Sequence, residues 1–244
     1  MPELGTRSCG NLLTNIAQRV TLMANMYESY FNLAEFPFRT TPDPRFLWYS
    51  EQHLEAKQKI VYHLRYSAGP IYLLANIGTG KTSIARRIHE ELNGDSNTRI
   101  VSVFAPKLTT TNAFLRFVMD EFGVKTERAF DRSLRNFENY LAEQHEQGIN
   151  CMLLVDEAQN MTRDMLLLIQ HLFNFSTSTT FLIHMALFAQ PELQPKLDRL
   201  DSLQSRLNLS KLKPFNPDET VELLRFRCTV AGGTDLPFPP DALQ

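Results

Sequence analysis

The chain has 244 residues, a formal net charge of −2 at pH 7, 43% hydrophobic residues and 21% charged residues. These proportions are ordinary for a globular protein, and the length suffices for one large domain or a core with a small appendage. The net charge excludes a global basic field that draws the chain onto nucleic acid, but it leaves room for a local basic patch. Three scattered cysteines without a C-x-x-C pair argue against a disulfide framework and against a zinc site.

No apolar run approaches the ~20 residues that a membrane span needs, and the first residues lack the layout of a signal peptide. We therefore expect a cytoplasmic protein without membrane insertion. Residues 1–25 are expected to form an N-terminal extension, either flexible or partly helical. Residues 26–70 are expected to form a linker followed by a helix at 51–66, where apolar residues recur at helical spacing.

The linker at 36–46 contains three prolines, which exclude a continuous helix or a central strand, so we expect an extended segment. Its aromatic and proline side chains are candidates to wall an adenine ring, and simple packing of the linker on the sheet is the alternative. These candidates are Phe38, Pro44 and Phe46.

Strands and helices alternate along residues 71–213, which we assign to one core. Short apolar strands that alternate with helices predict an α/β fold with a parallel sheet covered by helices on both faces. The expected elements are a strand at 71–74, a helix at 81–92, a strand at 99–104, helices near 111–122 and 131–147, a strand at 151–155, a helix at 164–174 and a strand at 180–188.

Residues 214–244 are predicted to form a partial helical domain. A helix at 218–230 is expected to be capped by Asn216 or Asp218 and stopped by Gly232 and Gly233. The segment 238–243 resembles the first turn of a further helix.

The clearest chemical motif joins the first strand to the next helix. Glycines there bring backbone N–H groups against phosphates at a helix N-terminus, which predicts an ATP-binding loop. Lys81 is expected to reach the β- and γ-phosphates, and the Thr82 hydroxyl is expected to hold Mg²⁺. The strict pattern begins with glycine, but the small Ala75 is expected to preserve binding; a chance turn in a surface loop is the alternative. The motif consists of Ala75, Asn76, Ile77, Gly78, Thr79, Gly80, Lys81 and Thr82.

A second motif consists of an apolar strand that ends in two acids, Asp156 and Glu157. The carboxyl ends of parallel strands meet at one edge of a sheet, so both acids are expected beside the phosphates. Asp156 is expected to hold Mg²⁺ through water, and Glu157 to act as the general base on the attacking water. A solvated helix start is the alternative.

Several segments together resemble the opening and the core motifs of the ExeA/GspA-type AAA+ ATPases, and this group is similar to the TniB/TnsC-type ATPases that regulate DNA transposition. The segments are MYESYFNL at 26–33, PF at 37–38, TPDPRFL at 41–47, DEAQN at 156–160, QPEL at 190–193 and LQSRL at 203–207. The resemblance runs from Met26 to the end of the chain. It implies an AAA+ P-loop core, a helical lid at 214–244, ATP hydrolysis, and rings or filaments that form with ATP.

By position in the resemblance, Gln190 is a sensor of the γ-phosphate, although a helix cap before Pro191 is the alternative. Arg206 is an arginine finger that reaches the nucleotide of a neighbouring subunit. A solvated surface charge is the alternative for Arg206, and Arg199 is a rival for the same role.

The resemblance leaves two roles open. The preferred expectation is a transposition regulator that assembles on duplex DNA and recruits a transposase, and the alternative is an ExeA-type ATPase that assists assembly of a secretion machine. A nucleotide-binding switch that hardly hydrolyses is a third reading, against which the full catalytic set counts. Lys107, Thr109 and Lys125 are the candidates to contact DNA phosphates without sequence preference. A polar helix cap with solvated lysines is the alternative for them.

Overall fold

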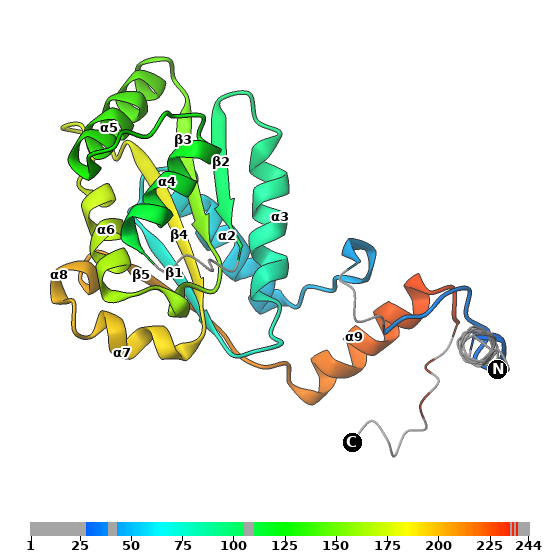
Figure 1. The fold of residues 1–244 in the computed structure, drawn as a ribbon. Coiled ribbons are helices and arrows are strands. Elements are labelled where there is room, and N and C mark those ends of the chain that lie inside the picture. Colours follow the sequence, from blue (N-terminus) through cyan, green and yellow to red (C-terminus); the bar gives the residue numbers. More distant parts are fainter. Residues whose placement is uncertain (1–27, 39–42, 105–109, 235, 237, 239–244) are drawn as a thin grey trace, which may run out of the picture. The chain divides into compact units, whose positions relative to one another are not determined.

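The computed structural model describes residues 28–38, 43–104, 110–234, 236 and 238 (Figure 1). These residues fall into two compact units. The first contains the described residues up to Trp48 and those from Phe215 onwards, and the second, the core, is Tyr49–Pro214. The expected extension at 1–25 and most of the expected turn at 238–243 lie outside the described residues.

The core is built on a five-stranded sheet in the order β2-β3-β4-β1-β5. All neighbouring strands are parallel, so the predicted α/β fold is confirmed. The strands are β1 (Ile71–Ala75), β2 (Thr98–Val103), β3 (Asn150–Val155), β4 (Ile183–Ala189) and β5 (Asn208–Leu212).

Helices cover both faces of this sheet, as predicted. On one face lie α2 (Glu51–Arg65) and α3 (Lys81–Asn93), whose apolar residues share a buried cluster with Ile71, Leu73 and Ala75. Tyr72 and Leu74 belong to the cluster on the other face, because successive side chains of a strand point to opposite sides.

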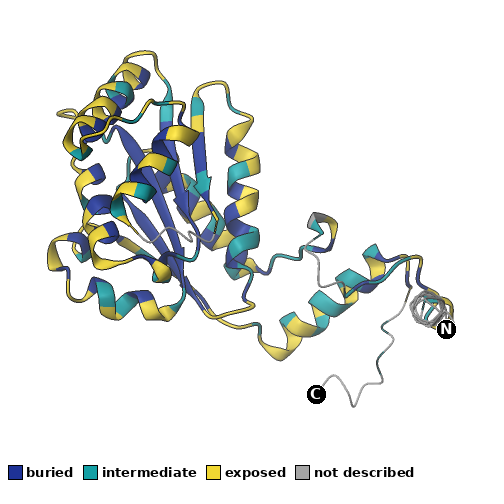
Figure 2. Cartoon of the chain, in the orientation of Figure 1, coloured by how far each residue is buried: buried dark blue, intermediate teal, exposed yellow. Residues whose placement is uncertain are grey.

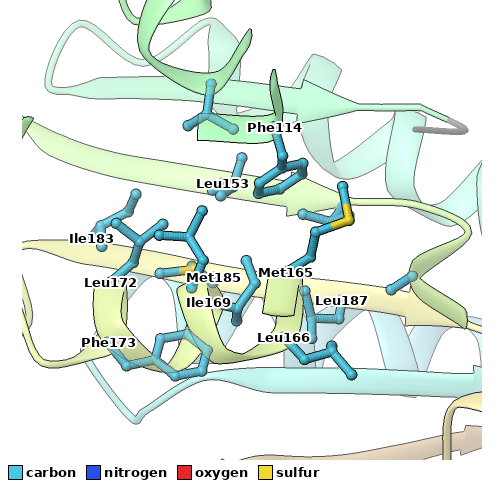
Figure 3. Packing of buried hydrophobic residues seen from close by; sticks show 14 of the residues in the cluster. Phe114, Leu153, Met165, Leu166, Ile169, Leu172, Phe173, Ile183, Met185 and Leu187 are labelled. Atoms are coloured by element: carbon cyan, nitrogen blue, oxygen red, sulfur yellow. The ribbon is translucent and has the colours of Figure 1, made fainter. Parts of the chain in front are cut away.

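That second cluster is built largely by three helices, α4 (Thr111–Glu121), α5 (Phe130–Glu146) and α6 (Arg163–Phe173). Figure 3 shows α6 laying a stripe of apolar side chains against β3 and β4. The three central strands, β3, β4 and β1, are almost entirely buried (Figure 2). Short helical segments complete the core, namely η2 (Ala158–Asn160), η3 (Pro191–Leu193), α7 (Gln194–Leu197) and α8 (Asp201–Gln204).

Two strand assignments differ from the prediction by more than one residue. β5 was not predicted, because its alternating polar residues lack the apolar run of the other strands. β4 begins at Ile183 rather than at residue 180, because Thr177 and Thr180 close a turn in which the Thr177 N–H donates to the Thr180 carbonyl at 2.8 Å. Phe181, which follows this turn, forms an isolated antiparallel bridge with Ser176 before the parallel strand starts.

The other unit joins the early segment to α9 (Pro217–Val230), whose N-cap is Asn216 as predicted. Leu33, Phe46 and Ala231 form its buried cluster, and the Ala34 N–H donates to the Ala231 carbonyl at 2.7 Å. The Phe46 ring, a candidate adenine wall, therefore serves packing within this unit.

The linker is not extended throughout, which corrects the prediction. Pro44–Phe46 forms a single 3-10 turn, η1, because proline is tolerated where a helix begins and its missing N–H has no partner to lose. The turn is stabilised by Asp43, whose side chain accepts from the Arg45 backbone N–H at 3.0 Å. The Arg45 guanidinium also pairs with Glu35 at 2.8 Å.

Among the described residues, no helix combines the length and the apolar character needed to cross a membrane.

Buried His184 on β4 makes the stability of the core depend on pH. Burial, with a smaller effect of the charge of His145, lowers the pKa of His184 to about 4. The unfolded chain has a histidine pKa of about 6.5, so between pH 6.5 and pH 4 it binds more protons than the folded chain and stability falls as the pH falls. We expect a loss of about 2 kcal/mol from this group between pH 7.5 and pH 5.

Urea unfolding of the wild type and of His184→Leu across this range measures that loss. The substituted chain lacks the titrating group, so its stability should fall by about 2 kcal/mol less than that of the wild type. Parallel pH profiles of the two proteins would contradict the assignment.

Candidate active site

The parallel sheet brings three sequence motifs to one edge. β1, β3 and β4 are neighbours that run in the same direction, so the residues after Ala75, Val155 and Ala189 emerge together. A pocket of about 450 Å³ opens at this edge. It is lined by Ile77, Gly78, Gly80, Lys81, Thr82, Ser83, Glu157 and Gln190. Ser83 was not predicted, although it directly follows the motif and lies in the first turn of α3.

The loop before α3 has the backbone that phosphate binding requires. Gly78 and Gly80 adopt φ of 79° and 89°, left-handed values that side-chain-bearing residues rarely adopt. Gly80 is also the N-cap of α3, so the N–H groups of the first helical turn have no partner within the helix. Together with the helix dipole they make this end of α3 suited to an anion.

Lys81 is only 5% exposed, and its ammonium group lies within the loop. Nζ donates to the carbonyls of Ala75 at 2.8 Å and Asn76 at 2.7 Å. Burial lowers the pKa of Lys81, while nearby carboxylates, with Glu157 the strongest, act in the opposite direction. A desolvated cation at the pocket wall interacts strongly with phosphate because the local dielectric is low.

Thr82 and Asp156 are joined across the site. The Thr82 hydroxyl donates to Asp156 Oδ2 at 2.6 Å, and the Glu157 N–H donates to Oδ1 at 2.9 Å. Burial raises the pKa of Asp156, and these two hydrogen bonds oppose that rise. A hydroxyl and a carboxylate are oxygen ligands of the kind that Mg²⁺ prefers, so this pair fits the predicted metal.

Glu157 lines the pocket and has an unusual backbone conformation. Its φ of 54° is left-handed, which is rare for a residue with a side chain. Its Oε2 accepts from the Gln159 amide at 2.5 Å and from the Gln190 amide at 3.2 Å. The carboxylate is therefore held in one orientation by two neutral donors.

Gln190 follows β4 and begins η3, but its side chain makes no capping bond there. The side-chain amide contacts Glu157 instead, and the Gln190 N–H donates to Gln159 Oε1 at 3.1 Å. No role was predicted for Gln159, although it lies two residues after the predicted base. Lys196 further fixes this turn by donating to the carbonyl oxygens of Gln159 and Met161.

Arg206 lies at the opposite edge of the sheet from this pocket. It precedes β5, whose first residue pairs with Ile71 at the start of β1. The five residues of β1 span roughly 17 Å, so Arg206 and the loop are held apart within one subunit. Arg206 is exposed, and its Nη1 donates to Asn174 Oδ1 at 2.5 Å. Arg199 is exposed as well, between α7 and α8.

The structure describes one of the three DNA candidates. Lys107 and Thr109 lie outside the described residues, whereas Lys125 is exposed after the far end of α4. The eleven residues of α4 extend roughly 16 Å from the edge at which that helix begins. The Thr110 hydroxyl accepts from the Ala113 N–H at 3.2 Å, so it caps α4.

Comparison with known proteins identifies several relatives. The family described as "AAA domain" matches residues 64–197. General secretion pathway protein A of Aeromonas hydrophila is 32% identical over 226 residues, which cover 90% of this chain and 40% of that protein. The chain thus spans less than half the length of this curated relative.

Solved structures share the fold at lower identity. The ORC2 protein of Aeropyrum pernix with ADPNP and ADP has a TM-score of 0.60 and 15% identity, covering 80% of this chain and 55% of that chain. Cdc6p of Pyrobaculum aerophilum has a TM-score of 0.60 and 17% identity, covering 83% and 57%. At such identities the similarity concerns the fold alone.

Proposed function

This chain belongs to the AAA domain family of ATPases, and we propose that it is an ATP-hydrolysing switch that works as an oligomer. One observation carries the proposal. One pocket is lined by the glycine-bearing loop before α3, by Glu157 after β3 and by Gln190, while Arg206 lies at the opposite edge of the same sheet.

In the proposed mechanism the loop N–H groups and Lys81 bind the β- and γ-phosphates of ATP. Mg²⁺, held by Thr82 and by Asp156 through water, would neutralise phosphate charge when bound. Glu157 takes a proton from the attacking water, and the amides of Gln159 and Gln190 hold its carboxylate in position. Gln190, which lines the same pocket, is proposed to sense the γ-phosphate.

Arg206 is proposed to complete the site of a neighbouring subunit. It cannot approach Lys81 of its own chain, because the sheet separates them. When two copies assemble, the exposed guanidinium of one copy can reach the pocket of the other. There it would stabilise charge that develops on the transferred phosphate. Hydrolysis would then require assembly.

Arg206→Ala is expected to lower ATP turnover by roughly 10³-fold or more while keeping most of the nucleotide affinity. Mixing it with Lys81→Ala should restore part of the turnover, because each variant supplies the group that the other lacks. Steady-state hydrolysis by each variant and by the mixture measures this. Arg199→Ala is the matched control, expected to keep activity. No recovery in a mixture of folded, co-assembling variants would place Arg206 in its own site.

Two biological roles are compatible with such a switch. We infer that a role in assembling a secretion machine has the better support, because a protein of the general secretion pathway is 32% identical over 90% of this chain. Regulation of DNA transposition, with assembly on duplex DNA and recruitment of a transposase, is the second candidate. It is supported by the resemblance to TniB/TnsC-type ATPases and by the exposed Lys125.

Electron microscopy with an ATP analogue, with and without duplex DNA, separates the two roles. Rings or filaments that form only with DNA would favour the transposition role. Fluorescence anisotropy across a salt series then tests Lys107 and Lys125, since each lost phosphate contact lowers the salt slope by about one unit. Assembly that ignores DNA, with no binding at low salt, would favour the secretion role.

A further inference from the structure

A buried histidine near the start of α2 contacts the loop between β1 and α3, on the side of the loop that faces α2. His53 is 3% exposed, and its Nε2 lies 2.8 Å from the Thr79 carbonyl oxygen. A carbonyl only accepts hydrogen bonds, so Nε2 must carry the proton and donate. On the other side of the ring, Nδ1 lies 2.8 Å from the Ser50 hydroxyl, and in a neutral imidazole it accepts from that hydroxyl.

Ser50 gives up an ordinary task to make this contact. It is the N-cap of α2, where a serine side chain commonly accepts from a backbone N–H of the first turn. No such capping bond forms here. The hydroxyl instead hydrogen-bonds His53 Nδ1 and helps to orient the ring.

The His53 ring also occupies the space next to Gly80. A Cβ added to Gly80 would lie 3.4 Å from His53 Nε2. Thr79 is 6% exposed, and its hydroxyl donates to the Asn76 carbonyl at 2.8 Å. The Thr79–Gly80 peptide is thus held at two points. His53 contacts the Thr79 carbonyl oxygen, and the Asn76 carbonyl accepts from the Thr79 hydroxyl.

The geometry of a peptide explains what this contact achieves. In a planar trans peptide the C=O and the N–H point in opposite directions. A Thr79 carbonyl held toward His53 therefore turns the Gly80 N–H away from α2, and Gly80 is one of the residues that line the pocket. The hydrogen bond from His53 to the Thr79 carbonyl therefore sets the direction of the Gly80 N–H, a donor of the loop.

We propose that His53 is a positioning residue of the phosphate-binding loop, with Ser50 as the group that orients its ring. The inference rests on the proposed function, in that the loop binds the phosphates of ATP. His53 holds the Thr79–Gly80 peptide in one orientation before the nucleotide binds. This lowers the conformational entropy that the loop loses on binding.

The same helix offers a matched control. His63, near the end of α2, is also buried, and its Nδ1 lies 3.0 Å from the Gly69 carbonyl in the turn before β1. His53 and His63 thus make the same kind of bond, one behind the loop and the other at the opposite end of β1. His63→Leu removes the second bond and leaves the loop untouched.

The test is the Kd of ADP and of a slowly hydrolysed ATP analogue, measured by calorimetry below the melting transition of each variant. His53→Leu is expected to raise both Kd values roughly 3- to 10-fold, the equivalent of about one hydrogen bond. His53→Gln keeps an amide donor of similar reach and should stay within about 2-fold of the wild type. His63→Leu should lower the melting temperature without changing either Kd.

Ser50→Ala provides a second test that leaves the loop and the imidazole in place. It is expected to raise Kd by roughly 2- to 3-fold, because the ring loses the hydrogen bond that helps to orient it. Wild-type affinity in both His53→Leu and Ser50→Ala, or equal weakening by His63→Leu, would overturn the positioning role. A wild-type chain that binds no nucleotide would overturn the proposed function and this inference with it, and only that result touches both.

Discussion

Replacement of Lys81 by alanine is expected to abolish measurable ATP binding. The ammonium is the buried cation at the wall of the pocket, and no other lysine or arginine lines this pocket among the described residues. Its loss removes charge-assisted hydrogen bonds to phosphate that are worth about 1.5–3 kcal/mol each, so two of them correspond to roughly 10²- to 10⁴-fold in affinity. Titration with a fluorescent ATP analogue measures the change.

Lys59→Ala is the control for this experiment. Lys59 Nζ also donates to a backbone carbonyl, that of Leu209 at 2.8 Å, but it does so away from the pocket. Its removal should leave nucleotide affinity unchanged. ATP binding by Lys81→Ala at wild-type strength would show that the loop does not hold the phosphates in the proposed way.

Glu157→Gln is expected to keep ATP binding and to slow hydrolysis by roughly 10²- to 10⁴-fold, the usual contribution of a general base. The amide is nearly the same size as the carboxylate but cannot accept the proton of the attacking water. Single-turnover hydrolysis and a binding titration on the same preparation separate the two effects.

Glu192→Gln is the corresponding control, because Glu192 is an exposed carboxylate whose charge reaches Lys81 without lining the pocket. It should leave the rate of the chemical step within a few-fold of the wild type. Hydrolysis by Glu157→Gln at the wild-type rate would assign the general base to another group.

Local patterns were sufficient to predict the centre of the fold. The glycines around Lys81 and the acids after β3 are read from short spacings, and the buried strands that carry them are continuous apolar runs. β5 lies at the edge of the sheet beside β1 only, and Asn208, Ser210 and Lys211 interrupt its apolar pattern. Its identity as a strand depends on pairing with β1, which a local pattern does not encode.

The side chains that support the candidate site were missed for a related reason. His53 meets the loop carbonyl of a residue 26 positions later, and Gln159 meets the N–H of a residue 31 positions later. Contacts of this kind exist only after the sheet has formed. A buried histidine in an amphipathic helix and a glutamine after two acids carry no local signal of them.

The pairing of Leu33 and Phe46 with Ala231 imposes an order on biosynthesis. The core is one continuous stretch, and domains generally fold as units while the chain is made. At about 5–20 residues per second, the ribosome needs roughly ten to forty seconds to proceed from the segment around Leu33 to α9. During that interval the two apolar side chains lack the partner that buries them. The early segment of this unit, although made first, is among the last described segments to reach its native contacts.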